Sequence, residues 1–333
     1  MKNWLEMFFY NCLIFSVLIC LSSNSWLSMW IGLEMNLLSI IPLMNNNSNS
    51  LSNEATLKYF LIQALASLLF LFFICVNFLK LNYFSIIFYN NLFLILMNST
   101  LLMKLGAAPF HFWFPPVMNK MPWKINLILL TWQKINPMIC ISFCLMNKFI
   151  IFISIISIIM GSLGGMSSVS LKKILAFSSI SHLGWMLNCM VLSENMFWFY
   201  FFFYLMINFS LIKLLTKMKI NYLNQLSSNY ISIKIKLMFS MLMLSMGGLP
   251  PFLGFIPKWL IINNMISLNM FWIILLMIMF TLMTLYFYLR MSFSLLIMNN
   301  INMYWIISFN NNFNNFWLYF SSMFIPLIFL FFN

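Results

Sequence analysis

Four charged side chains lie inside long apolar runs of this chain, where a water-soluble protein would not place them. Glu34 stands in WIGLEMNLL, Lys104 in LMKLGAAPF, Lys134 in LLTWQKINPM and Lys258 in GFIPKW. An ionisable group within a membrane segment is costly, so it usually faces protein or water and serves ion or proton transfer. A carboxylate and several amines in such places therefore predict a proton path. For Glu34 and Lys134, a structural ion pair stays open as an alternative.

Helix-breaking residues accompany two of these lysines. Gly106 and Pro109 follow Lys104, and His111 comes shortly after them; the segment GGLPPFLGFIP precedes Lys258. Proline removes a backbone donor, and carbonyls freed inside a membrane must find water or protein, so such breaks occur where a cavity is lined. The pattern predicts two broken helices beside proton-carrying groups. A plain proline kink between packed helices is the alternative.

A further polar cluster lies in AFSSISHLGW. Ser178, Ser181 and His182 fall on one helical face, at positions i, i+3 and i+4. Because histidine exchanges its proton near neutral pH, His182 is a candidate relay. The equally weighted alternative is that His182 only bonds a neighbouring backbone carbonyl.

The composition requires a membrane around these groups. Hydrophobic residues make up 63% of the chain and charged residues only 6%, with a mean hydropathy of +0.97. A soluble domain carries about 25% charged residues. The formal charge of +13 comes from lysines scattered between apolar runs, which does not favour a nucleic-acid-binding face.

The expected fold is all-α and polytopic, with about eleven apolar spans of the length that a bilayer requires. We expect one transmembrane domain, 1–333, with N-terminal helices in 1–82. The region 83–214 would hold the first broken helix and the central Lys134, and 215–333 the second broken helix and the C-terminal helices. The expected spans are 5–22, 26–44, 55–78, 83–105, 123–146, 149–166, 171–192, 195–214, 236–262, 269–290 and 316–332.

The basic residues indicate how this chain is oriented in the membrane. With the expected spans, Lys80 and Lys148 fall on one side, while most other loop and span-end lysines fall on the side of the N-terminus. That bias places the N-terminus in the compartment of synthesis, the cytoplasm or an organelle matrix, and the C-terminus opposite. Lys58 is interpreted separately, as a partner of Glu54 one helical turn earlier.

The two broken spans are the fourth and the ninth, so they run in opposite directions. Lys104 precedes its break and Lys258 follows its own, which is the mirrored order that an inverted repeat of five helices produces. The sequence therefore predicts two inverted five-helix repeats.

The chain offers no redox or metal chemistry of its own. The cysteines Cys140 and Cys144 lie one helical turn apart without a nearby histidine, and such thiols favour packing over metal binding. We find neither a G-x-G-x-x-G turn nor a cysteine cluster for iron–sulfur ligation.

Six motifs in order now support a resemblance. WIGLEMNLLSIIPL, EATLKYFLIQALAS, KLGAAPFHFWFP, TWQKINP, SLKKILAFSSISHLGWM and GGLPPFLGFIPKW resemble the subunit 2 family of NADH dehydrogenase in mitochondrial complex I, in its animal, insect-like form. The resemblance covers nearly the whole chain. It implies an antiporter-like fold and proton translocation across the mitochondrial inner membrane, with the N-terminus in the matrix and the C-terminus in the intermembrane space.

The resemblance also assigns roles. It implies a polar axis of Glu34, Lys104, Lys134 and Lys258, with a lysine where related antiporter-like subunits carry an acid on the second broken helix. Partners would be other membrane-arm subunits, including neighbouring antiporter-like ones, and membrane lipids, but no nucleic acid. This chain would bind no cofactor, because NADH, FMN, iron–sulfur clusters and ubiquinone are expected in other subunits.

Two other functions stay open at this point. A free-standing cation/proton antiporter of the same ancestry would exchange ions without a redox partner. A purely structural subunit would use the buried charges only to support assembly.

Overall fold

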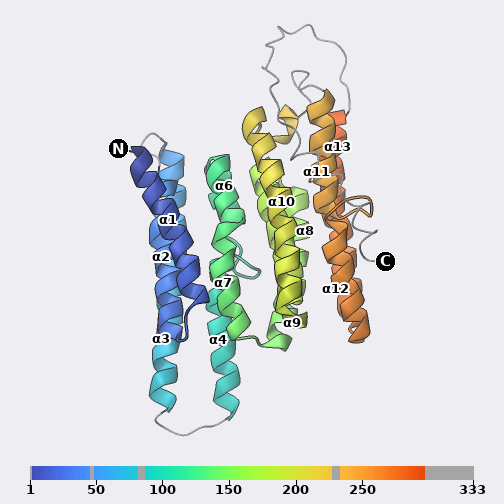
Figure 1. Cartoon of the computed structure of the whole chain (residues 1–333). Coiled ribbons are helices and arrows are strands. Elements are labelled where there is room, and N and C mark those ends of the chain that lie inside the picture. Colours follow the sequence, from blue (N-terminus) through green and yellow to red (C-terminus); the bar gives the residue numbers. More distant parts are fainter. Residues whose placement is uncertain (1, 46–48, 82–86, 227–232, 297–333) are drawn as a thin grey trace. The chain divides into compact units, whose positions relative to one another are not determined.

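The computed structural model describes residues 2–45, 49–81, 87–226 and 233–296 (Figure 1). Across these ranges the chain is helical and contains no strand. A single antiparallel backbone bridge joins Ser170 and Tyr222. The expected all-α class is therefore confirmed, whereas the expected span 316–332 lies outside the described residues.

The chain divides into two compact units, residues 1–157 and 158–333, and α8 (Asn147–Ser167) crosses the boundary. In the first unit α1 packs against α2, α2 against α3, and α4 against both α3 and α7. Its helices are α1 (Lys2–Leu21), α2 (Trp26–Met44), α3 (Ser50–Leu81), α4 (Ile87–Leu105), α5 (Phe114–Lys120), α6 (Trp123–Leu130) and α7 (Trp132–Phe143).

The second unit is arranged around α9, whose apolar stretch is almost wholly buried. The helices α10, α12 and α13 all contact α9, and α11 packs against α10 and α13. The helices are α9 (Leu171–Leu192), α10 (Glu194–Met218), the short 3₁₀ turn η1 (Leu223–Gln225), α11 (Ile233–Gly247), α12 (Phe255–Ser267) and α13 (Phe271–Leu296).

Seven of the described helices are long and apolar enough to cross a membrane, which are α1, α2, α3, α8, α9, α10 and α13. Large apolar side chains such as Trp4 and Trp272 are more than 75% exposed on these helices, as lipid-facing residues are. The ninth expected span, 236–262, is split into α11 and α12 as predicted. The count of eleven spans and the inverted relation of the repeats stay predictions.

One expected span differs from the structure. The sequence predicted a continuous helix over 123–146, but α6 ends at Leu130 and α7 begins at Trp132. The hydroxyl of Thr131 donates to the carbonyl of Leu127 at 2.7 Å, and the backbone of Thr131 leaves the helical geometry (φ −115°, ψ −74°). Back-bonding of this kind by threonine bends or interrupts a helix.

Candidate functional site: buried lysines at helix breaks

A glycine turn closes the carboxyl end of α4. Gly106 adopts the left-handed region with φ +71°, which glycine enters without steric cost. Its amide donates to the carbonyl of Met103 at 3.2 Å, and the amide of Ala107 donates to the carbonyl of Leu102 at 3.1 Å. This pair of bonds is the Schellman arrangement of a helix end. The predicted break after Lys104 is confirmed.

Two neutral side chains also donate to carbonyls of that helix end, one of which, that of Met103, already accepts from Gly106. The indole nitrogen of Trp113 donates to the carbonyl of Met103 at 3.1 Å, and Nε2 of Gln63 donates to the carbonyl of Lys104 at 3.0 Å. The Lys104 ammonium is buried and takes no part in this capping, since its Nζ has no hydrogen-bond partner among the described residues. It is therefore available for other chemistry.

The charged neighbour of Lys104 is Glu34 on α2. The two side chains interact electrostatically, although no ion pair within 4.0 Å joins them in the described part of the chain. The thiols of Cys20 on α1 and Cys140 on α7 also lie close to Lys104. Glu34 and Lys104, two members of the polar axis that the resemblance implies, thus interact in the first unit without a direct ion pair among the described residues.

Lys134 lies on the first turn of α7, directly after the interruption at Thr131. Its backbone amide donates to the carbonyl of Thr131 at 3.3 Å, and the residue is 2% exposed. Its ammonium stands 5.9 Å from the centroid of the Phe114 ring, which is within reach of a cation–π attraction. Lys104 lies one residue before the end of α4, and Lys134 lies on the first turn of α7. Lys258 likewise lies on the first turn of α12, so all three lysines are within one helical turn of a break.

His111 lies in the segment between α4 and α5 and is buried. Its ring is hydrogen-bonded to the backbone of Pro109 and lies 4.5 Å from the Phe112 ring, centroid to centroid. The amide of Phe114 donates to the His111 carbonyl at 3.0 Å, which continues the chain into α5. Its role in a proton path stays a prediction.

The second break, between α11 and α12, also ends on a glycine. Gly248 has φ +80°, and its amide donates to the carbonyl of Ser245 at 3.1 Å. Here the lysine does the capping, because Nζ of Lys258 donates to the carbonyl of Gly247 at 2.9 Å and to that of Met246 at 3.4 Å. The carboxyl end of a helix carries partial negative charge, so the ammonium suits this position. The predicted break and its lysine thus form one motif.

His182 on α9 is bonded to a tyrosine. Its Nδ1 and the hydroxyl of Tyr200 on α10 are 2.8 Å apart and hydrogen-bonded, and its ring lies 5.3 Å from that of Tyr204. The hydroxyls of Ser178 and Ser181 instead donate to carbonyls of their own helix, at 2.9 and 2.7 Å. Of the three residues on the predicted polar face, His182 therefore bonds to another helix through its side chain, whereas the two serine hydroxyls donate within α9. Sequence reasoning missed Tyr200, since nothing in the chain's spacing marks it.

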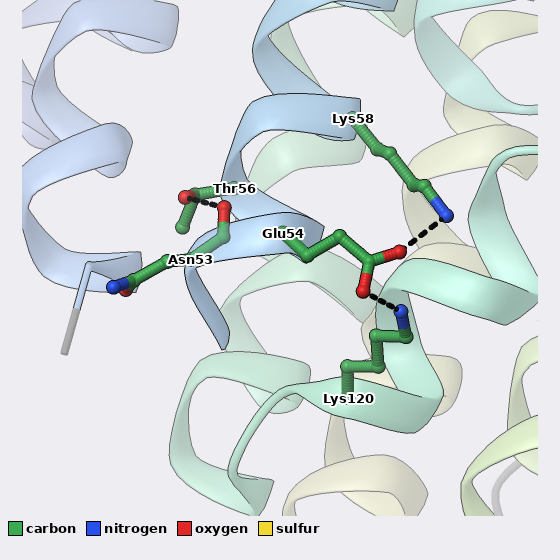
Figure 2. A network of polar contacts seen from close by, with 5 residues as sticks. All are labelled: Asn53, Glu54, Thr56, Lys58 and Lys120. Carbon is green, nitrogen blue, oxygen red and sulfur yellow. Dashed lines mark hydrogen bonds and ion pairs between the residues drawn. The ribbon is translucent and has the colours of Figure 1, made fainter. Parts of the chain in front are cut away.

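An ion cluster lies at the exposed start of α3, close to α5. Figure 2 shows the carboxylate of Glu54 between the ammonium groups of Lys58 and Lys120. The Glu54–Lys58 distance is 2.7 Å, which confirms the predicted pair. Lys120 is an additional partner that the sequence did not indicate, since it lies on a different helix.

The first unit thus brings Glu34 and Lys104 together and also holds His111 and Lys134. His182 and Lys258 belong to the second unit, on α9 and α12, which pack against each other. Among the described residues no group of three or more His, Cys, Asp or Glu side chains could hold a metal ion. The candidate groups of the first unit are two amines, one carboxylate and one imidazole, and those of the second are one amine and one imidazole.

Comparison with known proteins identifies the family. The transmembrane family model of NADH:quinone oxidoreductase and Mrp antiporters matches residues 23–284. The NADH-ubiquinone oxidoreductase chain 2 of Anopheles gambiae is 47% identical over 326 residues, covering 96% of this chain and 95% of that relative. This chain belongs to the NADH-ubiquinone oxidoreductase chain 2 family. As a member of that family it is a multi-pass protein of the mitochondrial inner membrane.

Solved structures share the fold of this chain. A chain of the respiratory complex I from Thermus thermophilus with bound aureothin is 25% identical, with a TM-score of 0.78, covering 86% of this chain and 70% of that one. A chain of the Mrp complex from Dietzia sp. DQ12-45-1b is 18% identical, with a TM-score of 0.72, covering 84% of this chain and 58% of that one. The second likeness shows the shared antiporter-like fold alone.

Proposed function

We propose that this chain is the antiporter-like, proton-translocating subunit of the membrane arm of NADH:ubiquinone oxidoreductase. The observation that carries this proposal is the Lys104 ammonium, which is buried at a helix break, has no hydrogen-bond partner in the described chain and has Glu34 as its charged neighbour. A lysine that caps a helix end is held by that structural role, whereas the ammonium of Lys104 is not.

The geometry supports a simple cycle at this site. A carboxylate near a buried ammonium stabilises its charged form, so Glu34 favours proton uptake by Lys104. When the influence of Glu34 weakens, burial favours the neutral amine and the proton leaves. Lys134, on a helix packed against α4, would take part in the next transfer. His111, His182 and Lys258 complete the set of groups that we assign to the path.

The free energy that drives this proton-transfer cycle would come from other subunits. Moving one proton against 100 mV requires about 2.3 kcal/mol. We assign NADH, FMN, the iron–sulfur clusters and ubiquinone to other subunits and no redox centre to this one. Its direct neighbours would be other membrane-arm subunits, including antiporter-like ones, with the N-terminus in the matrix and the C-terminus in the intermembrane space.

The test is proton pumping by complex I that carries Lys104→Met or Glu34→Gln, reconstituted in vesicles. We expect Lys104→Met to assemble and to lower the number of protons pumped per NADH oxidised, with Glu34→Gln changing it in the same direction. Lys219→Met is a suitable control, because Lys219 lies at the exposed end of α10. An unchanged pumping ratio in assembled Lys104→Met would contradict the proposal.

A further inference from the structure

One face of α3 carries a row of buried polar residues that the proposed cycle does not use. Tyr59, Gln63 and Ser67 follow each other at positions i, i+4 and i+8 and are 2%, 6% and 1% exposed. Polar groups buried at this depth in a membrane protein need hydrogen-bond partners. The side chains of Tyr59 and Gln63 find partners on other helices, whereas the hydroxyl of Ser67 donates within α3 and only its backbone carbonyl has a partner on another helix.

The partners lie on the helices that carry the candidate proton groups. Nε2 of Gln63 donates to the carbonyl of Lys104 on α4 at 3.0 Å, and the hydroxyl of Tyr59 donates to Oε1 of Gln133 on α7 at 3.1 Å. The carbonyl of Ser67 accepts from the indole nitrogen of Trp30 on α2 at 3.2 Å.

Each contact falls close to a charged group. Gln63 binds the backbone of Lys104 itself, Gln133 directly precedes Lys134, and Trp30 lies one helical turn before Glu34. The side-chain amide nitrogen of Gln133 extends the network, since Nε2 donates to Oδ1 of Asn36 on α2 at 3.0 Å. Helices α2, α3 and α7 are thereby tied together around the site.

We propose that this face of α3 is the positioning element of the proton site in the first unit, and that Gln63 is its decisive residue. This inference rests on the proposed function of Lys104. Gln63 supplies an uncharged donor to the Lys104 carbonyl, so the helix end is capped without use of the lysine ammonium. Among the described residues of the second unit no glutamine side chain donates to the break, and the Lys258 ammonium binds the freed carbonyls itself.

The contrast between the two breaks gives the physical reason. Both helix ends have a glycine turn that leaves carbonyls in need of donors. Gln63 meets that need at the carbonyl of Lys104, while Lys258 meets it at the other break. Gln63 therefore fixes the backbone from which Lys104 projects and leaves its ammonium unengaged.

Two further contacts join α3 to the segment that follows the break after Lys104. The Tyr59 ring packs edge-on against Trp113, with centroids 5.7 Å apart, and Glu54 binds Lys120 at the end of α5 (Figure 2). The Glu54 cluster is exposed, and exposed ion pairs contribute little. We therefore assign the positioning role to the buried contacts of Tyr59 and Gln63.

The test compares Gln63→Met with Gln63→His in complex I reconstituted in vesicles. Methionine keeps the length and volume of glutamine but cannot donate, whereas the ring nitrogen of histidine can place an N–H near the position of Nε2. We expect Gln63→Met to lower the protons pumped per NADH oxidised by about two-fold or more, and Gln63→His to restore most of that loss. A residue that only filled space would give the reverse order.

The matched control is Thr56→Val. Thr56 is buried on the same helix, and its hydroxyl donates only within α3, to the carbonyl of Asn53 at 2.7 Å (Figure 2). The substitution is close to isosteric, so we expect a normal pumping ratio.

Two outcomes would overturn the inference. One is a normal pumping ratio in assembled Gln63→Met, and the other is a loss that Gln63→His shares or exceeds. Lys104→Met, measured alongside, separates this failure from failure of the proposed function. If Lys104→Met lowers the pumping ratio and Gln63→Met does not, only the positioning role is wrong. If Lys104→Met itself pumps normally, the proposed function is wrong and the inference falls with it.

Discussion

The ammonium groups of Lys104 and Lys258 have opposite surroundings, although both lie beside a broken helix. The Lys258 ammonium donates to two backbone carbonyls, at 2.9 and 3.4 Å, whereas Nζ of Lys104 has no hydrogen-bond partner in the described chain. A buried carbonyl that loses its donor costs about 1–3 kcal/mol. Burying an ionisable group without a hydrogen bond is costly, so replacing the Lys104 ammonium with an apolar side chain removes that cost. The same substitution should therefore act differently at the two positions.

We predict that Lys258→Met lowers the amount of assembled complex I, while Lys104→Met does not. Methionine at position 258 leaves the carbonyls of Met246 and Gly247 without their donor. The measurement is the amount of the complex on native gels of membranes from the two variants. Lys258→Arg, which keeps a cationic donor, is the matched control and should assemble better than Lys258→Met. Equal assembly of Lys258→Met and Lys104→Met would show that the cap of α11 is not stabilising.

At the scale of the elements, the sequence predicted those breaks that glycine and proline mark. Gly106 and Gly248 both take positive φ angles, and both lie where the sequence placed a broken helix. The interruption at Thr131 was missed, because threonine is common within membrane helices. The sequence does not show whether its hydroxyl will donate to the carbonyl of Leu127 and so distort the helix. The partners Gln63 and Tyr200 were missed for another reason. Which helices meet is decided by tertiary packing, and a single sequence carries no signal for it.

We predict that Gly254→Ala disrupts the second break, while Gly247→Ala is tolerated. A Cβ atom on Gly254 would overlap the carbonyl oxygen of Ser245, so the backbone would have to move. The nearest atom to a Cβ on Gly247 is 3.6 Å away, on Leu285, which is ordinary contact. Alanine at position 247 also favours the helix by about 0.5–1 kcal/mol.

The measurement for this pair is again the yield of assembled complex, followed by its thermal inactivation. Gly254→Ala should give several-fold less complex than Gly247→Ala at the same temperature. If the two variants assemble equally, the close approach of Gly254 to Ser245 is not a requirement of the fold. Both substitutions add one methyl group, so the comparison removes the effect of side-chain size.

At the scale of the whole molecule, each compact unit combines a helix break at a glycine turn with a buried lysine beside it and a buried histidine. The first holds Lys104 and His111, and the second holds Lys258 and His182. The chain belongs to a family whose model names both oxidoreductase and antiporter members, so its fold alone is compatible with either. What separates the two is the source of the driving force. A subunit of complex I needs electron transfer in its partners, whereas an antiporter needs only an opposing cation gradient.

We predict that this chain migrates with the large NADH-oxidising complex and exchanges no cations by itself. The first measurement is a native gel of gently solubilised mitochondrial membranes, stained for NADH oxidation and probed for this chain. The second is a sodium or potassium pulse applied to vesicles that hold the intact complex without NADH, with a pH indicator inside. Because the lysines of both units are then without their energy source, the pulse should leave the internal pH unchanged, and NADH with ubiquinone should change it. Migration as a small separate species, together with cation-driven pH changes, would instead establish a free-standing antiporter, and the proton path assigned to Glu34 and Lys104 would then run on ion gradients.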